Sequence, residues 1–380
     1  MSDPGLTPAR PHVPARVAQA WVATMAGSSR GALVCAHDAP ALEVGAVEPR
    51  RRAEREAVED AQLARGATRA HGAGRRARLE EPDALRTCFE RDRDRIVHSK
   101  AFRRLAGKTQ VFVFPADHQR TRLTHAIEVA QVATAVARAT RLNVTLTDAI
   151  ALGHDCGHGP GGHASEPVFD ARLAGGFHHA PWGADVVLAP LNLCAETLDG
   201  IRSHSWSRPA PLTPEGAVVS WADRIAYCAH DLEDAVRAGI VDESALPEEV
   251  TELAGPTRSS QLGYFIGALV EGIEASGTVA MAAEPAAALA CLRSFNYERI
   301  YLRPEALAQG KAVADVLSAL VEHLARHPDL VQDTLGELDA LESAVRYVSG
   351  MTDRYAFESA LRLLDWPAER LPKGIDVSAR

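Results

Sequence analysis

A histidine and an aspartate stand side by side at the end of an apolar segment. His154 and Asp155 lie in the stretch ALGHDCGHGPGGHASE, where the apolar run gives way to a glycine-rich turn. Burying a carboxylate without a partner is unfavourable, and a divalent cation would stabilise both side chains at once. Imidazole nitrogen and carboxylate oxygen form a donor set that suits Mg, Mn, Fe, Ni or Zn. The dipeptide alone favours a plain helix end, in which the His interacts with the helix dipole and the Asp caps a turn.

Two other segments can bring further ligands to this pair. His125 opens a long predicted helix after RTRLT, and the residues between it and His154 suffice for that helix, a turn and an antiparallel return. Asp223, Tyr227 and Asp231 are spaced i, i+4, i+8 in SWADRIAYCAHDLEDA, so they share one helix face. That face is compatible with a solvated charged surface, but the apolar Trp-Ala-Asp start favours an interior position for Asp223.

Together these motifs resemble the HD superfamily of metal-dependent phosphohydrolases, whose signature is His, then His-Asp, then a distant Asp. Within it, the runs RTCFERDRDRIVHSKAFRRLAGKTQVF, RTRLTHAIEVAQ, GHDCGHGPGGHASE and WADRIAYCAHDLEDA look like those of the bacterial deoxyguanosine triphosphate triphosphohydrolases. The segment YVSGMTDRYA, residues 347–356, resembles one near the end of that family. Several long motifs occur in the right order between about residues 62 and 365, which makes the resemblance specific.

The resemblance implies a role for each candidate site residue. The ligands of a divalent cation (Mg, Mn or another transition metal such as Fe, Ni or Zn) would be His125, His154, Asp155 and Asp223. The catalytic pocket would be lined by His158, His163, Glu166 and His179, of which His163 and Glu166 resemble a pair that acts on the attacking water or the leaving group. The phosphates and the deoxyribose would be held by Gln110, Arg122, Arg224, Tyr227 and Asp231. The implied reaction converts a deoxynucleoside triphosphate, plausibly dGTP, and water into a deoxynucleoside and tripolyphosphate.

Two other functions stay open at this point. An HD phosphohydrolase could keep the metal and act on another nucleotide, although Cys-Gly-His-Gly after His-Asp differs from the alarmone hydrolases of the superfamily. A catalytically weak nucleotide-binding regulator is the second alternative, because Ala-Pro-Trp-Gly at 180–183 replaces a polar stretch that is usual in the family. The complete set of ligand positions favours an enzyme.

The elements that must position these residues are helices. Apolar periodicity predicts helices at 91–105, 123–141, 146–154, 214–238, 259–274, 305–327 and 337–364, and one extended segment at 110–114 (QVFVF). The predicted fold class is all-α, an HD-domain helical bundle with additional C-terminal helices. The metal-binding core is expected at about 118–235 of a domain that covers 61–380. Residues 1–60, rich in Ala, Arg, Pro and Gly, are predicted to be a mostly disordered extension.

Composition and net charge indicate which partners and which cell compartment to expect for this protein. The 380 residues carry a net charge of −9, which is not typical of a nucleic-acid binder, so nucleic acid is not a required partner. The six scattered cysteines form no CxxC pair, a pattern that fits reduced thiols in the cytoplasm. No apolar run approaches the length of a membrane span. We therefore expect a cytoplasmic enzyme. The family resemblance implies that the chain forms a homo-oligomer. The arginines at 86–104, interspersed with acids, predict mainly a salt-bridged helix surface.

Overall fold

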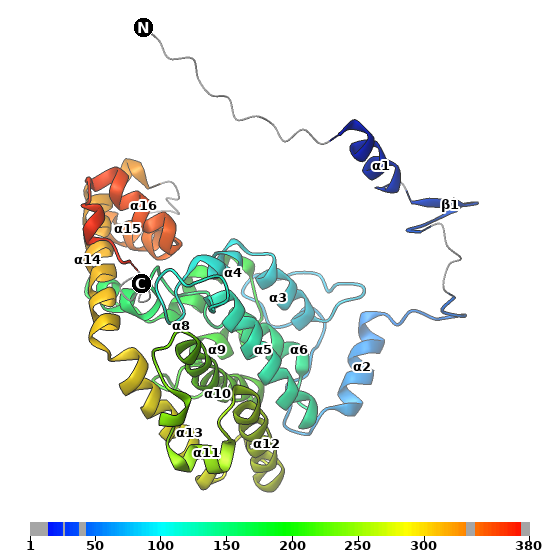
Figure 1. The fold of residues 1–380 in the computed structure, drawn as a ribbon. Coiled ribbons are helices and arrows are strands. Elements are labelled where there is room, and N and C mark those ends of the chain that lie inside the picture. Colours follow the sequence, from blue (N-terminus) through cyan, green and yellow to red (C-terminus); the bar gives the residue numbers. More distant parts are fainter. Residues whose placement is uncertain (1–13, 26, 38–42, 332–338, 374–380) are drawn as a thin grey trace. The chain divides into compact units, whose positions relative to one another are not determined.

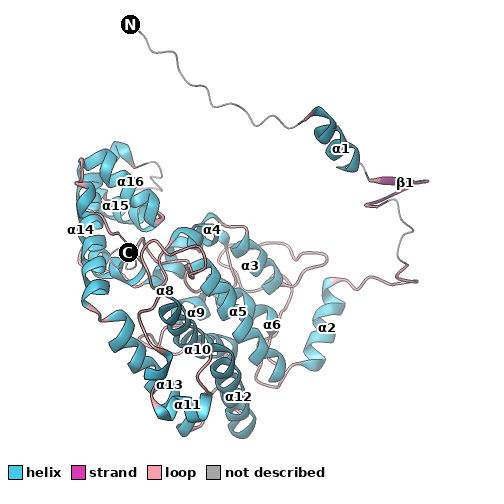
Figure 2. Cartoon of the chain, viewed as in Figure 1, coloured by secondary structure: helices cyan, strands magenta, loops and turns pink. Residues whose placement is uncertain are grey.

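The computed structural model describes residues 14–25, 27–37, 43–331 and 339–373, which belong to two compact units. The first unit, residues 1–49, contains α1 (Ala15–Met25) and an antiparallel hairpin of β1 (Ser28–Arg30) and β2 (Leu33–Cys35), with Ser28 opposite Cys35. The second unit, residues 50–380, contains every residue that the sequence nominates for chemistry. Strands within the described ranges are confined to the first unit, so the all-α prediction is confirmed (Figure 2).

Helices build the second unit (Figure 1). In chain order they are α2 (Arg52–Gln62), α3 (Cys88–Val97), α4 (Lys100–Arg104), α5 (Arg122–Ala139), α6 (Val144–Gly153), α7 (Glu166–Asp170), α8 (His179–Trp182), α9 (Ala195–Ser203), α10 (Pro214–Arg237), α11 (Glu248–Ala254), α12 (Arg258–Ser276), α13 (Ala283–Asn296), α14 (Pro304–Arg326), α15 (Ala340–Ser349) and α16 (Asp353–Leu364). The predicted helices that correspond to α5, α6, α10, α12 and α14 are confirmed, with ends shifted by at most two residues.

Two predicted helices are each split in two by a capping residue. The helix predicted at 91–105 is broken into α3 and α4, because the Ser99 hydroxyl accepts the Phe102 N–H and starts a new helix. The helix predicted at 337–364 is divided into α15 and α16, where the Thr352 side chain accepts the Tyr355 N–H. Its first two predicted residues lie outside the described ranges. The sequence reasoning also missed α9, α11 and α13.

The main core lies where α5, α6 and α10 pack against one another. Val129, Val132 and Val136 on α5 are fully buried, as are Ile150 on α6 and Ile225 on α10. Each such side chain contributes roughly 1.5–3 kcal/mol by leaving water. Helices α3, α9, α12 and α13 pack around this centre. The packing fixes the start of α5, the end of α6 and the middle of α10 relative to one another.

A second apolar cluster joins the C-terminal helices to the rest of the unit. Val316, Leu317 and Leu320 of α14 are fully buried with Val345 of α15 and with Phe357 of α16. The α14 helix also packs against α7 and the turn that precedes it, as its course in Figure 1 shows. Helix α14 therefore connects the C-terminal helices to the glycine-rich turn after the His-Asp pair.

The segment predicted to be extended, residues 110–114, forms no strand. Thr109 makes one isolated bridge with Thr121, the chain then bends, and Phe114 has a left-handed φ of 53°. The aromatic and β-branched side chains of this segment pack into the core instead. Phe112 is buried in the main apolar cluster and Val113 in the second one. A β-propensity pattern without a neighbouring strand to pair with does not make a sheet.

The arginine-rich segment forms the salt-bridged surface that was predicted. The Glu80 carboxylate accepts hydrogen bonds from Arg91 and Arg95, each at 2.5 Å, and Arg86 pairs with Asp83 and Asp94. These cations therefore have structural partners of their own.

The ordered unit begins earlier than the boundary predicted at residue 60. Helix α2 belongs to the second unit, because Arg55 pairs with Glu90 at 2.6 Å and the Glu59 carboxylate accepts from the Asn143 amide at 3.2 Å. The Ala- and Arg-rich composition concealed an amphipathic helix here. Within the segment predicted to be mostly disordered, Ala15–Met25 form α1, and residues 1–13, 26 and 38–42 lie outside the described residues.

Candidate metal centre and active-site pocket

Three helices bring the four predicted metal ligands together. His125 lies in the first turns of α5, His154 is the C-cap of α6 with Asp155 directly after it, and Asp223 lies in the middle of α10. The rings of His125 and His154 have their centroids 5.4 Å apart, so the helix, turn and antiparallel return expected from the spacing is confirmed. His125, His154 and Asp155 offer ligand atoms within 4.8 Å of one another and could hold a metal ion.

The donor atoms lie close enough together for one cation to bind them all. His125 Nε2 lies 3.0 Å from Asp223 Oδ1 and 3.9 Å from Asp155 Oδ2. His154 Nε2 lies 3.5 Å from Asp155 Oδ1 and 3.7 Å from Asp223 Oδ1. Ligands that each lie ~2.1 Å from an ion are ~3.0 Å apart when adjacent and ~4.2 Å apart when opposite. The observed distances fall between these limits.

One ligand nitrogen is buried and has no partner of its own. His154 donates its Nδ1 hydrogen to the Ala151 carbonyl at 2.6 Å, which leaves the Nε2 lone pair directed at the other ligands. This Nε2 atom is buried and makes no hydrogen bond. A backbone carbonyl that fixes the imidazole in this way is the usual support of a metal-binding histidine. The residues therefore fit a divalent cation.

The charges around the centre compensate one another. Burial alone would raise the pKa of Asp155, but Arg122, whose guanidinium donates to Oδ2 at 2.8 Å, and the neighbouring imidazoles hold it well below its usual value. Burial would lower the pKa of His125, but its hydrogen bond to Asp223 raises it. Asp155 thus stays an anion, as a metal ligand must.

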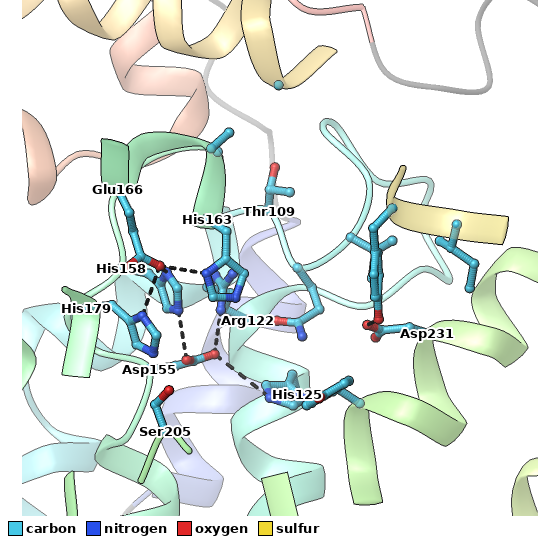
Figure 3. A pocket seen from close by; sticks show the side chains of 18 of the residues that line it. Thr109, Arg122, His125, Asp155, His158, His163, Glu166, His179, Ser205 and Asp231 are labelled. Carbon is cyan, nitrogen blue, oxygen red and sulfur yellow. Dashed lines mark hydrogen bonds and ion pairs between the residues drawn. The ribbon is translucent and has the colours of Figure 1, made fainter. Parts of the chain in front are cut away.

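A cluster of three histidines around Glu166 lies beside the metal ligands (Figure 3). The Glu166 Oε1 atom accepts from His163 Nδ1 at 2.6 Å and from His179 Nδ1 at 3.0 Å. Burial would raise the pKa of Glu166, but these two hydrogen bonds keep it well below its ordinary value. The His163 ring is 72% exposed, whereas His158 and His179 are buried and stacked at 3.8 Å. His163 is therefore the imidazole of this cluster that is most accessible to a ligand.

A single cavity of about 870 Å³ contains both groups and the predicted substrate-binding residues. Twelve of the thirteen nominated side chains line it, and His154 lies behind them against His125. The polar groups nominated for the sugar and the phosphates are Gln110, Arg122, Arg224, Tyr227 and Asp231. The Oε1 atom of Gln110 and the Nε atom of Arg224 are buried without a hydrogen-bond partner, so both can bond a ligand.

Comparisons with known proteins identify the family to which the chain belongs. A model of the HD domain matches residues 122–228, and a model of the phosphohydrolase-associated domain matches residues 279–362. A deoxyguanosinetriphosphate triphosphohydrolase-like protein from Caldanaerobacter subterraneus subsp. tengcongensis is 42% identical over 292 residues, which cover 74% of this chain and 86% of the relative. The chain belongs to the HD-domain family of deoxyguanosinetriphosphate triphosphohydrolase-like proteins. The family predicted from the motifs is confirmed, and membership supports a phosphohydrolase.

Other members of this family show the same extent of similarity. A deoxyguanosinetriphosphate triphosphohydrolase-like protein from Clostridium perfringens is 41% identical over 299 residues, covering 74% of this chain and 87% of the relative. One from Deinococcus radiodurans is 36% identical over 366 residues, covering 81% and 98%. Among the residues that the structure describes, none of the helices is long and apolar enough to cross a membrane.

The sequence reasoning missed His204, a fifth buried histidine at the centre of this HD-domain protein. Its Nε2 atom lies 3.2 Å from His179 Nε2, and its ring packs edge-on against His154 at 4.9 Å. Burial lowers the pKa of His204 to about 3, so the ring is neutral. It could serve as a further ligand with His154 and Asp223. No motif signals it, because it follows α9 far from the other ligands in the chain.

The pocket side of α10 gains three partners that the sequence did not reveal. The Arg224 guanidinium lies over the Trp206 ring, 3.4 Å from its centroid. Arg293 donates to the Tyr227 hydroxyl at 2.8 Å. The Tyr301 hydroxyl donates to Asp231, whose pKa burial raises to about 7. Trp206 lies in the loop that precedes α10, and Arg293 and Tyr301 follow α12, so the helical spacing within α10 could not predict these contacts.

The unusual segment at 180–183 packs tightly against the glycine turn. A Cβ atom added to Gly157 would lie 2.0 Å from the His179 carbonyl oxygen and 2.4 Å from the Gly183 nitrogen. Only glycines permit this approach, which holds His179 beside His158. The departure from the family pattern thus leaves the histidine cluster assembled, which argues against the regulator alternative.

Proposed function

We propose that this protein is a metal-dependent deoxynucleoside triphosphate triphosphohydrolase that converts dGTP and water into deoxyguanosine and tripolyphosphate. One observation carries the proposal. A metal-binding set, an exposed imidazole bonded to a carboxylate, and cationic and sugar-binding side chains all face one cavity of about 870 Å³. A nucleotide fits a cavity of this size.

His125, His154, Asp155 and Asp223 would hold the divalent cation, which we expect to be Mg, Mn or another transition metal such as Fe, Ni or Zn. When bound, the ion neutralises charge on the α-phosphate and lowers the pKa of water. Arg122 reaches across from α5 to Asp155, so its remaining N–H groups can bond the same phosphate.

His163 and Glu166 would move the proton. The oxygen of water would bond to the α-phosphorus and give up a proton to His163, the bond from that phosphorus to the 5′ oxygen would break, and His163 would return the proton to the leaving alkoxide. His163 lines the cavity, and the bond between its Nδ1 atom and the charged Glu166 carboxylate orients the ring. His158 and His179 complete the wall around this pair. Both ring nitrogens of His158 are buried without a hydrogen-bond partner and would bond the phosphate or water, whereas those of His179 already contact Glu166 and His204.

The rest of the cavity would recognise the nucleotide. Arg224 carries its charge on the pocket side, with the Trp206 ring as its neighbour and no carboxylate paired to it in the described chain, so phosphate oxygens are its natural partners. Gln110, Tyr227 and Asp231 offer acceptors and donors for the sugar hydroxyl. The Gln110 Oε1 atom gives the most direct indication that this wall binds a ligand. It is buried and accepts no hydrogen bond, which is unfavourable until a donor such as a sugar hydroxyl occupies it.

The experiment is a product analysis over the four common dNTPs, GTP, dGMP and a cyclic dinucleotide, with Mn or Mg and after chelation. The proposal expects metal-dependent release of deoxynucleoside and tripolyphosphate in equal amounts, with dGTP preferred. Hydrolysis of another nucleotide class alone would replace the substrate assignment. Binding without turnover of any of them would support a regulator instead.

A further inference from the structure

The C-terminal motif YVSGMTDRYA reaches the active site through one buried carboxylate. Asp353, the first residue of α16, is 4% exposed. Its Oδ2 atom accepts from the Thr109 N–H at 2.9 Å and from the Thr109 hydroxyl at 2.6 Å. Its Oδ1 atom accepts from the Gly161 N–H at 2.8 Å. One side chain therefore joins two loops that are separate in the sequence.

A buried lysine makes a second connection between the same segments. The Lys108 ammonium donates to the carbonyl of Ser349, at the end of α15, at 3.0 Å, and also to the carbonyl of His158. Lys108 is 4% exposed and lies next to Thr109 in the chain. The C-terminal helices thus contact the 107–110 loop at two points and the glycine turn at one, and Lys108 joins the two loops directly.

Both loops end in residues that face the cavity. Gln110 follows Thr109, and His163 follows Gly161 and Gly162, whose φ values are +71° and +62°. Glycines at left-handed φ have little conformational preference of their own, so this turn needs contacts to define it. An added Cβ on Gly162 would lie 2.9 Å from the Thr109 carbonyl oxygen and 2.6 Å from an Arg122 nitrogen, which shows how closely the turn packs.

We propose that Asp353 is a positioning residue, which holds the glycine turn and the 107–110 loop together so that His163 and Gln110 face the substrate. The inference rests on the proposed function for its kinetic consequences. A carboxylate buried at this depth is unfavourable unless it is hydrogen-bonded, and every bond that it makes goes to one of these two loops. An apolar residue would serve a purely structural core position better.

The test is Asp353→Asn, which keeps the shape but presents an NH₂ group to one of the two N–H donors. One loop then loses its acceptor. We expect kcat to fall by about 10- to 100-fold with bound metal retained, since loss of alignment at a general acid–base residue has this order of effect. Asp339→Ala is the matched control. It removes the N-cap of α15, which accepts the Glu342 N–H, without touching either loop, so its kcat should stay near that of wild type.

A double-mutant cycle separates positioning from general destabilisation. If Asp353 acts through His163, then Asp353→Asn should add little to the kcat loss of His163→Asn, whereas independent effects would multiply. Thr109→Val provides a second variant in case Asp353→Asn folds poorly, because it removes one bond to Asp353 and keeps the side-chain shape. A kcat for both variants close to wild type, or losses that multiply with His163→Asn, would overturn the proposal.

Hydrogen exchange makes the test independent of the substrate assignment. Asp353→Asn should speed amide exchange in peptides covering 157–163 and 107–112 and leave α5 and α10 unchanged, whereas Asp339→Ala should not affect those loops. If the two loops exchange faster in Asp353→Asn but the wild-type protein hydrolyses no dNTP, the tethering role stands and only the proposed function is rejected. Unchanged exchange in both loops would reject the tethering itself.

Discussion

Replacing His163 by Asn distinguishes a proton-transfer role from a binding role. The imidazole is 72% exposed, and its Nδ1 atom bonds Glu166 at 2.6 Å. None of the four nominated metal ligands hydrogen-bonds to it. The substitution therefore removes an accessible titratable group and leaves the metal centre and the cores intact.

The expected effects on catalysis and on stability differ enough to be separated. Loss of a general acid or base lowers turnover by on the order of 10²–10⁴-fold, which corresponds to about 2.7–5.5 kcal/mol of transition-state stabilisation. An exposed ion pair contributes roughly 0–1 kcal/mol to folding. The melting temperature should consequently change by no more than a few degrees, and nucleotide affinity should change little because the phosphate and sugar contacts remain.

The assay combines steady-state turnover with calorimetric nucleotide affinity and elemental analysis of the bound metal. His327→Asn is the matched control, since this exposed imidazole also has a local Nδ1 contact, to the His323 carbonyl, but lies outside the pocket lining. It should leave turnover unchanged. Turnover of His163→Asn within about three-fold of wild type would refute the acid–base assignment, because a metal-only mechanism would then suffice.

Three further predictions address the metal, the domain boundary and the charged surface. Asp155→Ala should lose bound metal and activity while circular dichroism stays helical; full metal content by elemental analysis would make the ligand assignment wrong. Deleting residues 1–49 should leave the melting temperature unchanged, whereas deleting 1–62 should lower it, because α2 belongs to the second unit; equal melting temperatures would contradict this. Hydrogen bonds, first that from Arg95, lower the pKa of Glu80 from 4.5 to about 2, so its stabilisation is complete above pH 4.5 and lost as the pH falls toward 2. Glu80→Gln should therefore lower the free energy of unfolding at neutral pH by about 1–2 kcal/mol, allowing for partial exposure, and denaturant titrations should show the difference shrinking across that range.

The family resemblance nominated the residues of the candidate centre, and helical spacing indicated which of them could lie side by side. His125, His154 and Asp155 could be placed together because two antiparallel helices with a short connection must bring those ends side by side. Asp223, Tyr227 and Asp231 could be assigned to one face because the helical period is fixed. Local chemistry thus sufficed where one helix, or a pair of adjacent helices, determines the geometry.

Contacts made through tertiary packing could not be predicted in this way. His204 and Tyr301 approach the site from elements whose position depends on the whole fold. The residues at 110–114 have the composition of a strand, yet no partner strand exists within the described part of the second unit, so burial of Phe112 decided their conformation. The two helix breaks were foreseeable, since Ser99 and Thr352 are good N-caps inside otherwise continuous patterns.

Hydrolysis of dGTP in water enriched in oxygen-18 tests the central claim most directly. Attack on the α-phosphorus at this metal centre predicts one labelled oxygen in tripolyphosphate, unlabelled deoxyguanosine in equal amount, and neither product from Asp155→Ala. Formation of dGMP with pyrophosphate, label in the 5′-hydroxyl of deoxyguanosine, or undiminished turnover by Asp155→Ala would contradict the account.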